Sequence, residues 1–487
     1  MRTSFSVAKS VPAGAAVLVT PVASEGPVPK ELGLSRAQLS GMGFDGKACS
    51  TLALPPVSGS KQARVVVGIG SPRDLDDKTM RNIGAAVARA CSRHKSMATT
   101  LAGAGRSNKR TGTKALVEGM ALALHRWTDL KKDKSSVPAL VDVTFVADSP
   151  DVRAGVAEGT TTARAVTMAR DWANTPPSHL TATKFANEAV KLAKATGLRV
   201  TVYDKKQLQE MGCGGIVGVN AGSVEPPRVV KLVWAPAGAK TKVVLVGKGV
   251  MYDSGGISLK PSDASHASMK MDMSGAAAVL ATMSTLKALK VKTHVTAYLM
   301  CTDNLPSGSA MKLGDVLTFR NGKTAEIHNT DAEGRLILAD GLSLGAESKP
   351  DAMVDIATLT GACMAALGKR MAGVLGNNQG VVDQLLASSA RTDEQLWQLP
   401  LHREYRALLD SNVADFRNIG GPYGGAITAS LFLDEFTNGV PWAHLDIAGP
   451  MESEGDSGWL NRGATAYGTR LLIDFVSNFR KPARPKK

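Results

Sequence analysis

The stretch VVLVGKGVMYDSGGISLK, residues 243–260, joins a run of apolar residues to a group of charged ones. Its first half has the length and β-branched composition of a buried strand, and we expect Lys248 and Asp253 to lie at the carboxyl end of that strand. A glycine pair then turns the chain and leads to Lys260. Surface charges are usually scattered, so charges collected behind a buried strand indicate a functional site.

Similar apolar runs recur through the second half of the chain and alternate with helical patterns. The runs are RVTVYD (199–204), VVKLVWA (229–235), KVVLVGKG (242–249), HVTAYLM (294–300), DAMVDIATL (351–359) and WAHLDIAG (442–449). Near-continuous apolar strands separated by helices predict a mostly parallel sheet covered on both faces. Such sheets bind ligands at the carboxyl ends of their strands. We therefore predict that the larger domain is an α/β/α sandwich.

The first 150 residues predict a smaller α/β domain. Its strand patterns are AAVLVTPV (15–22), which a short tail precedes, ARVVVGIG (63–70) and LVDVTFVAD (140–148), and its helical patterns cover 76–94 and 117–130. A long helical pattern from residue 151 stops at Pro176 and Pro177. The predicted organisation is an N-terminal α/β domain at 1–150, a connecting helix within 151–178, and a catalytic domain at 179–487.

The composition limits the possible protein classes. Of the 487 residues, 44% are hydrophobic and 21% are charged, which is typical of a globular protein, and no apolar run reaches the ~20 residues that span a bilayer. Five widely spaced cysteines without a CxxC pair argue against a disulfide framework and favour a reducing compartment, the cytoplasm. No acidic residue precedes Glu25. Organelle transit peptides are also poor in acidic residues, so an organellar location is the alternative.

The net charge of +15 raises the possibility of a polyanionic partner. Basic residues cluster at 106–110, at 131–136 and in the tail RKPARPKK at 480–487. No nucleic-acid-binding motif accompanies these clusters, which argues against a specific nucleic-acid partner. The charge alone keeps one alternative open, namely a nucleic-acid-binding role of the basic oligomer, with or without catalysis.

A second charged group lies in IHNTDAEGRLILADGLSLG, residues 327–345. If NTDAEGR is extended, Asp331, Glu333 and Arg335 share one face, and a helix begins after them. Asp272 directly precedes another helical pattern, where the helix dipole favours a carboxylate. Together with Asp253, the sequence thus offers four carboxylates near the mouth of the predicted sheet.

Four carboxylates suit two divalent cations, as in dinuclear aminopeptidases, phosphatases and nucleases. Oxygen ligands suit Mg²⁺ and Mn²⁺, and Zn²⁺ also accepts carboxylates. Lysine can join such a site only when it loses its proton. The chain has no HExxH zinc motif and no GxSxG elbow. A metal-dependent phosphoesterase or nuclease stays open at this point.

Several stretches resemble the leucyl aminopeptidase family, the cytosolic-type dinuclear metallo-exopeptidases. The similar stretches are VGKGVMYDSGGISLK, NTDAEGRLILAD, DWANTPPSHLTATKFA, ATLTGACMAALG, NIGGPYGGAITASLFLDEF and WAHLDIAGPM. The resemblance is strong from about Asp171 to the end and weak over the first 150 residues. It implies a homohexamer that hydrolytically releases N-terminal, preferably apolar, residues from peptides with a free N-terminus.

The resemblance also implies roles for individual residues. Two divalent ions (Zn²⁺ or Mn²⁺, with Mg²⁺ as the alternative) would be held by Lys248, Asp253, Asp272, Asp331 and Glu333, with a bridging hydroxide as nucleophile. Lys260 would stabilise the oxyanion, and Arg335 with Leu359 would hold a bicarbonate that acts as general base. The substrate would be bound by Met269, Asn329, Thr358, Gly361, Ala448 and Met451.

Two departures from the common family pattern lie near the first charged stretch. The segment between Lys260 and Asp272 is one residue longer and contains His266. Met251 and Tyr252 stand where threonine and phenylalanine are common. The lengthened segment lies on the predicted substrate side of the site.

Overall fold

The computed structural model describes residues 1–104 and 108–483. The chain divides into two compact units, of which unit 1 comprises Met1–Thr167 with Glu454–Arg462 and unit 2 comprises Met168–Ser453 with Gly463–Lys487. The division falls within the long helix α4 (Pro150–Asn174), which covers most of the predicted connecting segment. The predicted domain limits at 150 and 178 stay a prediction. Within the described residues, no helix is long and apolar enough to cross a membrane.

Unit 1 is built on a six-stranded sheet with the order β1-β6-β5-β2-β4-β3, in which β3 runs antiparallel to β4 and the other pairs are parallel. Its strands are β1 (Ser4–Ala8), β2 (Val17–Ala23), β3 (Thr51–Leu54), β4 (Ala63–Gly70), β5 (Ser96–Thr99) and β6 (Asp142–Val146). Its helices are α1 (Arg36–Gly41), α2 (Asp77–Ala90) and α3 (Lys109–Leu124). The predicted smaller α/β domain is confirmed. The expected tail was wrong, because Ser4–Ala8 pairs with β6 as a half-exposed edge strand of only five residues, which gives a short pattern.

Unit 2 contains an eight-stranded sheet with the order β15-β14-β17-β13-β9-β10-β8-β7. The four central strands β17, β13, β9 and β10 are mutually parallel, and antiparallel pairs occur toward the two edges. The strands are β7 (Arg199–Tyr203), β8 (Arg228–Trp234), β9 (Lys242–Asp253), β10 (His294–Asn304), β13 (Ala352–Ala357), β14 (Ala372–Gly376), β15 (Leu396–Gln398) and β17 (Trp442–Asp446). The predicted α/β fold with a mostly parallel central region is confirmed.

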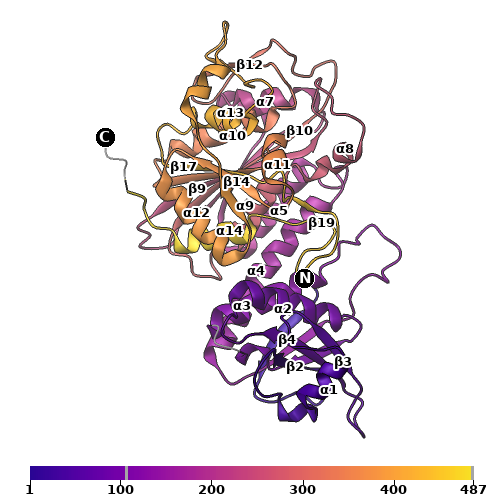
Figure 1. Cartoon of the computed structure of the whole chain (residues 1–487). Coiled ribbons are helices and arrows are strands. Elements are labelled where there is room, and N and C mark those ends of the chain that lie inside the picture. Colours follow the sequence, from indigo (N-terminus) through magenta and orange to yellow (C-terminus); the bar gives the residue numbers. More distant parts are fainter. Residues whose placement is uncertain (105–107, 484–487) are drawn as a thin grey trace. The chain divides into compact units, whose positions relative to one another are not determined.

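Helices cover both faces of this sheet, as Figure 1 shows. One face packs against α5 (Ala182–Thr196), α9 (Ser274–Thr285), α12 (Gln379–Thr392) and α14 (Thr469–Asn478). The other face packs against α7 (Gly214–Val219), α10 (Glu333–Ala346) and α13 (Gly425–Asp434). The remaining helices are α6 (Lys205–Glu210), α8 (Ala264–Ser268) and α11 (Gly361–Leu367). Both faces of the central strands are therefore buried, which explains their continuous apolar sequence.

Two small sheets complete unit 2. One consists of β11 (Val316–Thr318), β12 (Thr324–Glu326) and β16 (Phe416–Arg417). The other pairs β18 (Glu452–Ser453) with β19 (Gly463–Ala464). The first of them lies close in sequence to the NTDAEGR segment, so it helps to fix where that segment enters the site.

Candidate metal centre

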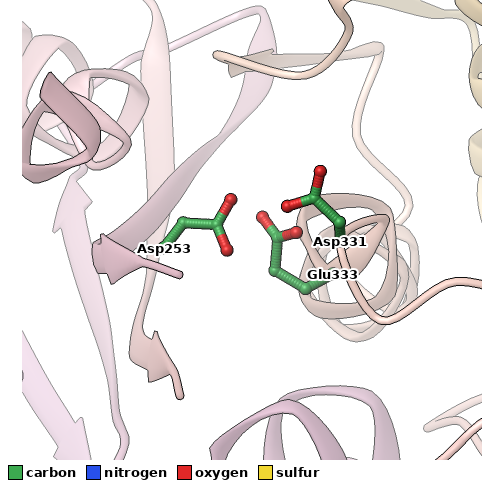
Figure 2. A group of neighbouring side chains, drawn as sticks. All are labelled: Asp253, Asp331 and Glu333. Carbon is green, nitrogen blue, oxygen red and sulfur yellow. The ribbon is translucent and has the colours of Figure 1, made fainter. Parts of the chain in front are cut away.

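Three carboxylates converge beyond the carboxyl end of the central strands. Asp253 is the last residue of β9, Asp331 lies in the turn after β12, and Glu333 is the first residue of α10. Each offers a carboxylate oxygen, and these oxygens all lie within 4.8 Å of one another. Figure 2 shows the three side chains pointing toward one another. Such a group of oxygens is typical of a divalent cation site.

The expected extended conformation of NTDAEGR was wrong. Residues 330–331 form a turn, and α10 already begins at Glu333, so Arg335 belongs to its first turn. An acidic residue is common in the first turn of a helix, where the helix dipole favours it, so a helix start at Glu333 agrees with the sequence. The carboxylates still converge, but a turn followed by a helix brings them together instead of the alternation of a strand.

The predicted end of the first strand was also wrong, because β9 continues to Asp253 and contains Lys248 in its interior. Side chains five residues apart in a regular strand point to opposite faces of the sheet. The pairing of β9 with β10 shifts register here, from Val250 opposite Thr302 to Asp253 opposite Asn304, so β9 contains one extra residue. This bulge allows Lys248 and Asp253 to approach the same cluster.

Asp272 reaches the cluster from the opposite face of the sheet, ahead of α9. A Cβ on Gly275 of α9 would lie 2.1 Å from the carbonyl oxygen of Ile356 in β13, so only glycine permits this close packing of helix on strand. The Oδ1 atom of Asp272 lies 2.9 Å from the Nζ atom of Lys248 and accepts a 2.6 Å hydrogen bond from Thr358. Lys248 therefore joins Asp272 to the carboxylates on the other side of the sheet.

Two lysines pair with the four carboxylates. Lys248 is 2.8 Å from Glu333 and donates a 2.8 Å hydrogen bond to the carbonyl of Thr358. Lys260 follows the glycine turn, in which Gly255 has a positive φ of 87°, and lies 2.8 Å from Asp253 and 2.5 Å from Asp331. The side chains of Lys260 and Asp331 are 18% and 33% exposed, whereas the other members are buried. The cluster therefore opens to solvent beside Lys260.

The electrostatics of the cluster are unbalanced. Burial, followed by the charge of Asp253, raises the pKa of Glu333 to about 8, and burial raises the pKa of Asp272 to about 6. Burial and the neighbouring Asp253 also raise the pKa of Asp331. Burial alone would lower the pKa of Lys248, but the surrounding carboxylates outweigh it and raise that pKa. Four carboxylates thus share two ammonium groups, an arrangement that additional positive charge would stabilise.

The surroundings of one carboxylate oxygen indicate whether the residues present fit a metal ion. The Oδ2 atom of Asp272 is buried and has no hydrogen-bond partner among the described residues. A buried carboxylate oxygen without a donor is costly, and a bound cation would satisfy it. The donor set is rich in oxygen, which is the ligand chemistry of divalent cations. The residues present therefore fit divalent metal ions.

Arg335 is buried beside this cluster. Its Nη1 atom donates a 2.8 Å hydrogen bond to the carbonyl of Asn418, and its Nε atom has no hydrogen-bond partner within the described part of the chain. Burial lowers the pKa of Arg335 to about 10. Because the guanidinium is desolvated and not fully hydrogen-bonded, it has a free donor for an acceptor or an anion.

The residues expected to bind the substrate lie on neighbouring loops. Thr358 and Gly361 follow β13, and Ala448 follows the adjacent parallel strand β17. Asp446 links the two loops, since its Oδ1 atom accepts hydrogen bonds from the backbone of Leu359 and of Ala448. Met269 precedes Asp272, Met451 follows Ala448 in the loop after β17, and the Oδ1 atom of Asn329 accepts a 2.8 Å bond from the backbone of Asp331.

The sequence interpretation missed the residues that orient the cluster. Asn304 donates hydrogen bonds to Asp253 and to the carbonyl of Thr330. Asn418 accepts from the backbone of Asn329 and donates to its carbonyl. The only signal for Asn304 was a polar residue a few positions after the apolar run 294–300, and Asn418 gave none, because it lies far from the motif in sequence.

The two departures from the family pattern contact each other. The additional residue lies in the segment that contains the short helix α8, and the ring of His266 from α8 stacks on Tyr252 of β9. The ring centroids are 5.8 Å apart with an interplanar angle of 23°. The lengthened segment is therefore anchored to the strand that carries Asp253.

The basic clusters give no further support to nucleic-acid binding. Residues 106 and 107 of the first cluster and 484–487 of the tail lie outside the described residues. Arg110 pairs with Glu158, and Lys134 donates to the carbonyl of Thr128. The predicted nucleic-acid role therefore stays a prediction.

Comparison with known proteins agrees with the geometry. The catalytic-domain model of the cytosol aminopeptidase family matches residues 167–473, and the N-terminal-domain model of the same family matches residues 28–134. The chain is 39% identical over 437 residues to a probable cytosol aminopeptidase of Aquifex aeolicus (strain VF5), covering 89% of this chain and 88% of that one. It is 41% identical over 441 residues to a probable cytosol aminopeptidase of Geobacter sp. (strain M21), covering 89% of each.

A solved structure is similar over nearly the whole length. It is described as the bottromycin maturation enzyme BotP in complex with Mn, with a TM-score of 0.88 and 36% identity, covering 95% of this chain and 99% of that one. Two family models and relatives of this identity and coverage lead to one conclusion. The chain belongs to the cytosol aminopeptidase family and is an aminopeptidase, a hydrolase that acts on peptide bonds.

Proposed function

We propose that this aminopeptidase uses two divalent metal ions to release apolar N-terminal residues from peptides. The observation that carries the proposal is the cluster of four carboxylates and two lysines, which contains a buried carboxylate oxygen without a partner and opens to solvent beside Lys260. Membership in the aminopeptidase family favours peptides over the phosphate esters that other dinuclear sites hydrolyse.

The proposed metal ligands are Lys248, Asp253, Asp272, Asp331 and Glu333. Two bound ions, Zn²⁺ or Mn²⁺ with Mg²⁺ as the alternative, would polarise the scissile carbonyl and acidify a water molecule. Asp253, Asp331 and Glu333 offer oxygens within 4.8 Å of one another, so these three residues would serve as ligands together. Lys248 keeps its proton among the carboxylates, so ligation through its Nζ atom would release that proton.

Lys260 is the proposed oxyanion-stabilising residue. It lies at the exposed side of the cluster, and its ammonium group keeps a positive charge because Asp253 and Asp331 raise its pKa against the effect of burial. A fixed positive charge beside the scissile carbonyl stabilises the negative charge that develops on the carbonyl oxygen. Substrate would displace part of its present pairing with the two aspartates.

Arg335 and Leu359 form the proposed bicarbonate site. The unpartnered Nε atom of Arg335 offers a charged donor. Leu359 lies in the loop after β13, and its backbone N–H, which donates a 3.3 Å hydrogen bond to Asp446, would have to exchange this partner for the bicarbonate. A bicarbonate held there would accept a proton from the attacking water as general base.

The proposed substrate pocket explains the preference for apolar side chains. Its members are small or apolar residues with one amide, namely Met269, Asn329, Thr358, Gly361, Ala448 and Met451. Methionine adapts to irregular aliphatic side chains such as leucine. A free α-amine of the peptide would bind at the metal centre, which limits cleavage to the first residue.

A homohexamer and a cytoplasmic location complete the proposal. The assembly rests on the family resemblance, and the location rests on the cytosol aminopeptidase names of the relatives and on the five free cysteines. Size-exclusion chromatography with light scattering tests the assembly.

The decisive experiment measures p-nitroaniline release from leucine-p-nitroanilide. We expect chelation to abolish release, added Mn²⁺ or Zn²⁺ to restore it, and N-acetylated substrate to remain intact. The rates of release from arginine- and glutamate-p-nitroanilide, compared with the rate from the leucine substrate, measure the preference for the first side chain. A folded, metal-loaded protein that cleaves none of these substrates would refute the proposal, whereas faster cleavage of a charged substrate would refute only the apolar preference.

A further inference from the structure

Asn304 lies at the carboxyl end of β10, beside the last residue of β9. The register shift between these strands places Asn304 opposite Asp253, whereas a regular ladder would place it opposite Tyr252. Bulges next to active sites often redirect side chains in this way. The residue is only 3% exposed, so its polar atoms depend on partners within the protein.

The side-chain amide of Asn304 joins two segments of the cluster. Its Nδ2 atom donates a 2.8 Å hydrogen bond to the Oδ1 atom of Asp253 and a 3.0 Å hydrogen bond to the carbonyl of Thr330. Thr330 directly precedes Asp331. Both N–H groups of one amide are therefore used to hold the end of β9 against the turn that supplies Asp331.

The same junction fixes the turn that leads to Lys260. The backbone carbonyl of Asn304 accepts hydrogen bonds from the backbone N–H and the hydroxyl of Ser254, at 3.0 and 2.7 Å. The hydroxyl of Thr330 donates to the carbonyl of Gly255 at 2.6 Å and accepts from the backbone of Ser258 at 2.8 Å. Asn304 and Thr330 thus hold three chain segments that meet at the cluster.

The chemistry of the amide suits this position. The Oδ1 atom of Asp253 receives hydrogen bonds from two neutral donors, Asn304 and the backbone N–H of Gly255. Neutral donors orient a carboxylate without bringing a positive charge that would compete with cations for it. A lysine or arginine in place of Asn304 would add such a charge, and an aspartate would repel Asp253.

We propose that Asn304 is a positioning residue that presents Asp253 and the Asp331 turn in the arrangement that binds metal. The inference rests on the proposed function of the cluster as a metal site. Residues that orient metal ligands typically contribute 10–100-fold in metal affinity or activity. Asn304 acts through Asp253 and has no assigned contact with substrate.

The test is titration of the full-length, metal-stripped protein with Mn²⁺ in a calorimeter, combined with steady-state kinetics. We expect Asn304→Ala to weaken Mn²⁺ binding by about 10–100-fold and to lower kcat more than it raises KM. Excess Mn²⁺ should recover part of the lost activity. Asn304→Ser, which keeps one small donor, should weaken binding less and provides the measurement if the alanine variant does not fold.

Asn220→Ala is the matched control. Asn220 is also fully buried in unit 2, and its Nδ2 atom also makes two hydrogen bonds, to the carbonyl of Glu225 and the hydroxyl of Thr302. It contacts none of the proposed ligands in those bonds, so its loss should lower the melting temperature but leave Mn²⁺ affinity within about threefold.

The outcomes separate the inference from the proposed function. Folded Asn304 variants that bind Mn²⁺ within twofold of the unsubstituted protein would overturn the inference, as would equal losses of affinity in the Asn220 control. Failure of the unsubstituted protein itself to bind Mn²⁺ would instead refute the metal site.

Discussion

Glu333 and Asp340 lie seven residues apart on α10 and have different surroundings. Both side chains are buried, and burial raises the pKa of Glu333 to about 8 and that of Asp340 to about 7. Asp340 accepts 2.9 Å hydrogen bonds from the backbone N–H groups of Ile216 and Arg320. Glu333 instead faces Lys248 and three other carboxylates.

The difference separates a structural carboxylate from a proposed metal ligand. Backbone donors around Asp340 satisfy its oxygens and tie α7 and the β11–β12 turn to α10. Among the described residues, no backbone N–H group is bonded to Glu333, and like charges surround it, which favours binding of cations. Burial and a raised pKa alone therefore do not identify the site, whereas the kind of neighbour does.

The largest expected effect follows replacement of Glu333. We expect Glu333→Gln to lower kcat/KM by more than ~100-fold, beyond the range typical of residues that only orient ligands. The metal-free protein should be no less stable, because the substitution removes one charge from a repulsive group. Kinetics and Mn²⁺ titration measure the loss. A variant with full activity and full Mn²⁺ affinity would remove Glu333 from the proposed ligand set.

Asp340→Asn should lower the stability of the fold but leave the activity nearly unchanged, the opposite of Glu333→Gln. The new amide points a donor at backbone N–H groups that need an acceptor, so we expect a loss of about 1–3 kcal/mol in the free energy of unfolding. The activity of the folded fraction should stay within about twofold. Urea unfolding and kinetics at a temperature well below the melting transition check both parts. Loss of activity without loss of stability would show that the two carboxylates do not differ as described.

The smallest effect concerns pH. Both carboxyl groups hold a proton more tightly in the folded protein, so the stability they contribute is present below their ordinary pKa values of 3.8 and 4.5. It is lost as the pH rises through about 7 for Asp340 and about 8 for Glu333. The melting temperature of the metal-free protein should therefore fall between pH 5 and 8.5.

The contributions of Glu333 and Asp340 to this pH effect can be measured separately with a variant and with bound metal. Glu333→Gln should make the fall shallower in the metal-free protein, and bound Mn²⁺ should remove the contribution of Glu333 but keep that of Asp340. Differential scanning fluorimetry at a series of pH values measures both. A melting temperature that rises with pH, or that is unaffected by either carboxylate, would contradict the assignment.

Much of the fold could be predicted from local patterns. The apolar runs predicted the central strands β9, β10, β13 and β17 because each is buried on both faces and has to be apolar along its length. The edge strand β1 was missed because half-exposed residues give a weak pattern. Helix α5 ends at Gly197, whose left-handed conformation, with a φ of 75°, is typical of a glycine at a helix C-terminus.

The candidate site could be predicted as a set of residues but not as an arrangement. The motifs VGKGVMYDSGGISLK and NTDAEGR provided three of the four carboxylates and both lysines, and Asp272 was identified by the helical pattern that follows it; their roles stay a prediction. The extended conformation expected for NTDAEGR was wrong, because a local pattern of charges does not distinguish a strand from a turn with a helix start. Asn304 and Asn418 were missed because their partners are distant in sequence.

By itself, the sequence determined which residues are present: the oxygen-rich set of candidate ligands and the buried strands that end beside it. It also determined the family. Only the tertiary structure decided how these residues are brought together in space. A single extra residue in β9, visible as the register shift against β10, lets Lys248 and Asp253 act on one cluster although they are five positions apart. The physical reason is that strand alternation is strict, so the face of a side chain depends on pairing with a neighbouring strand, which is a non-local contact.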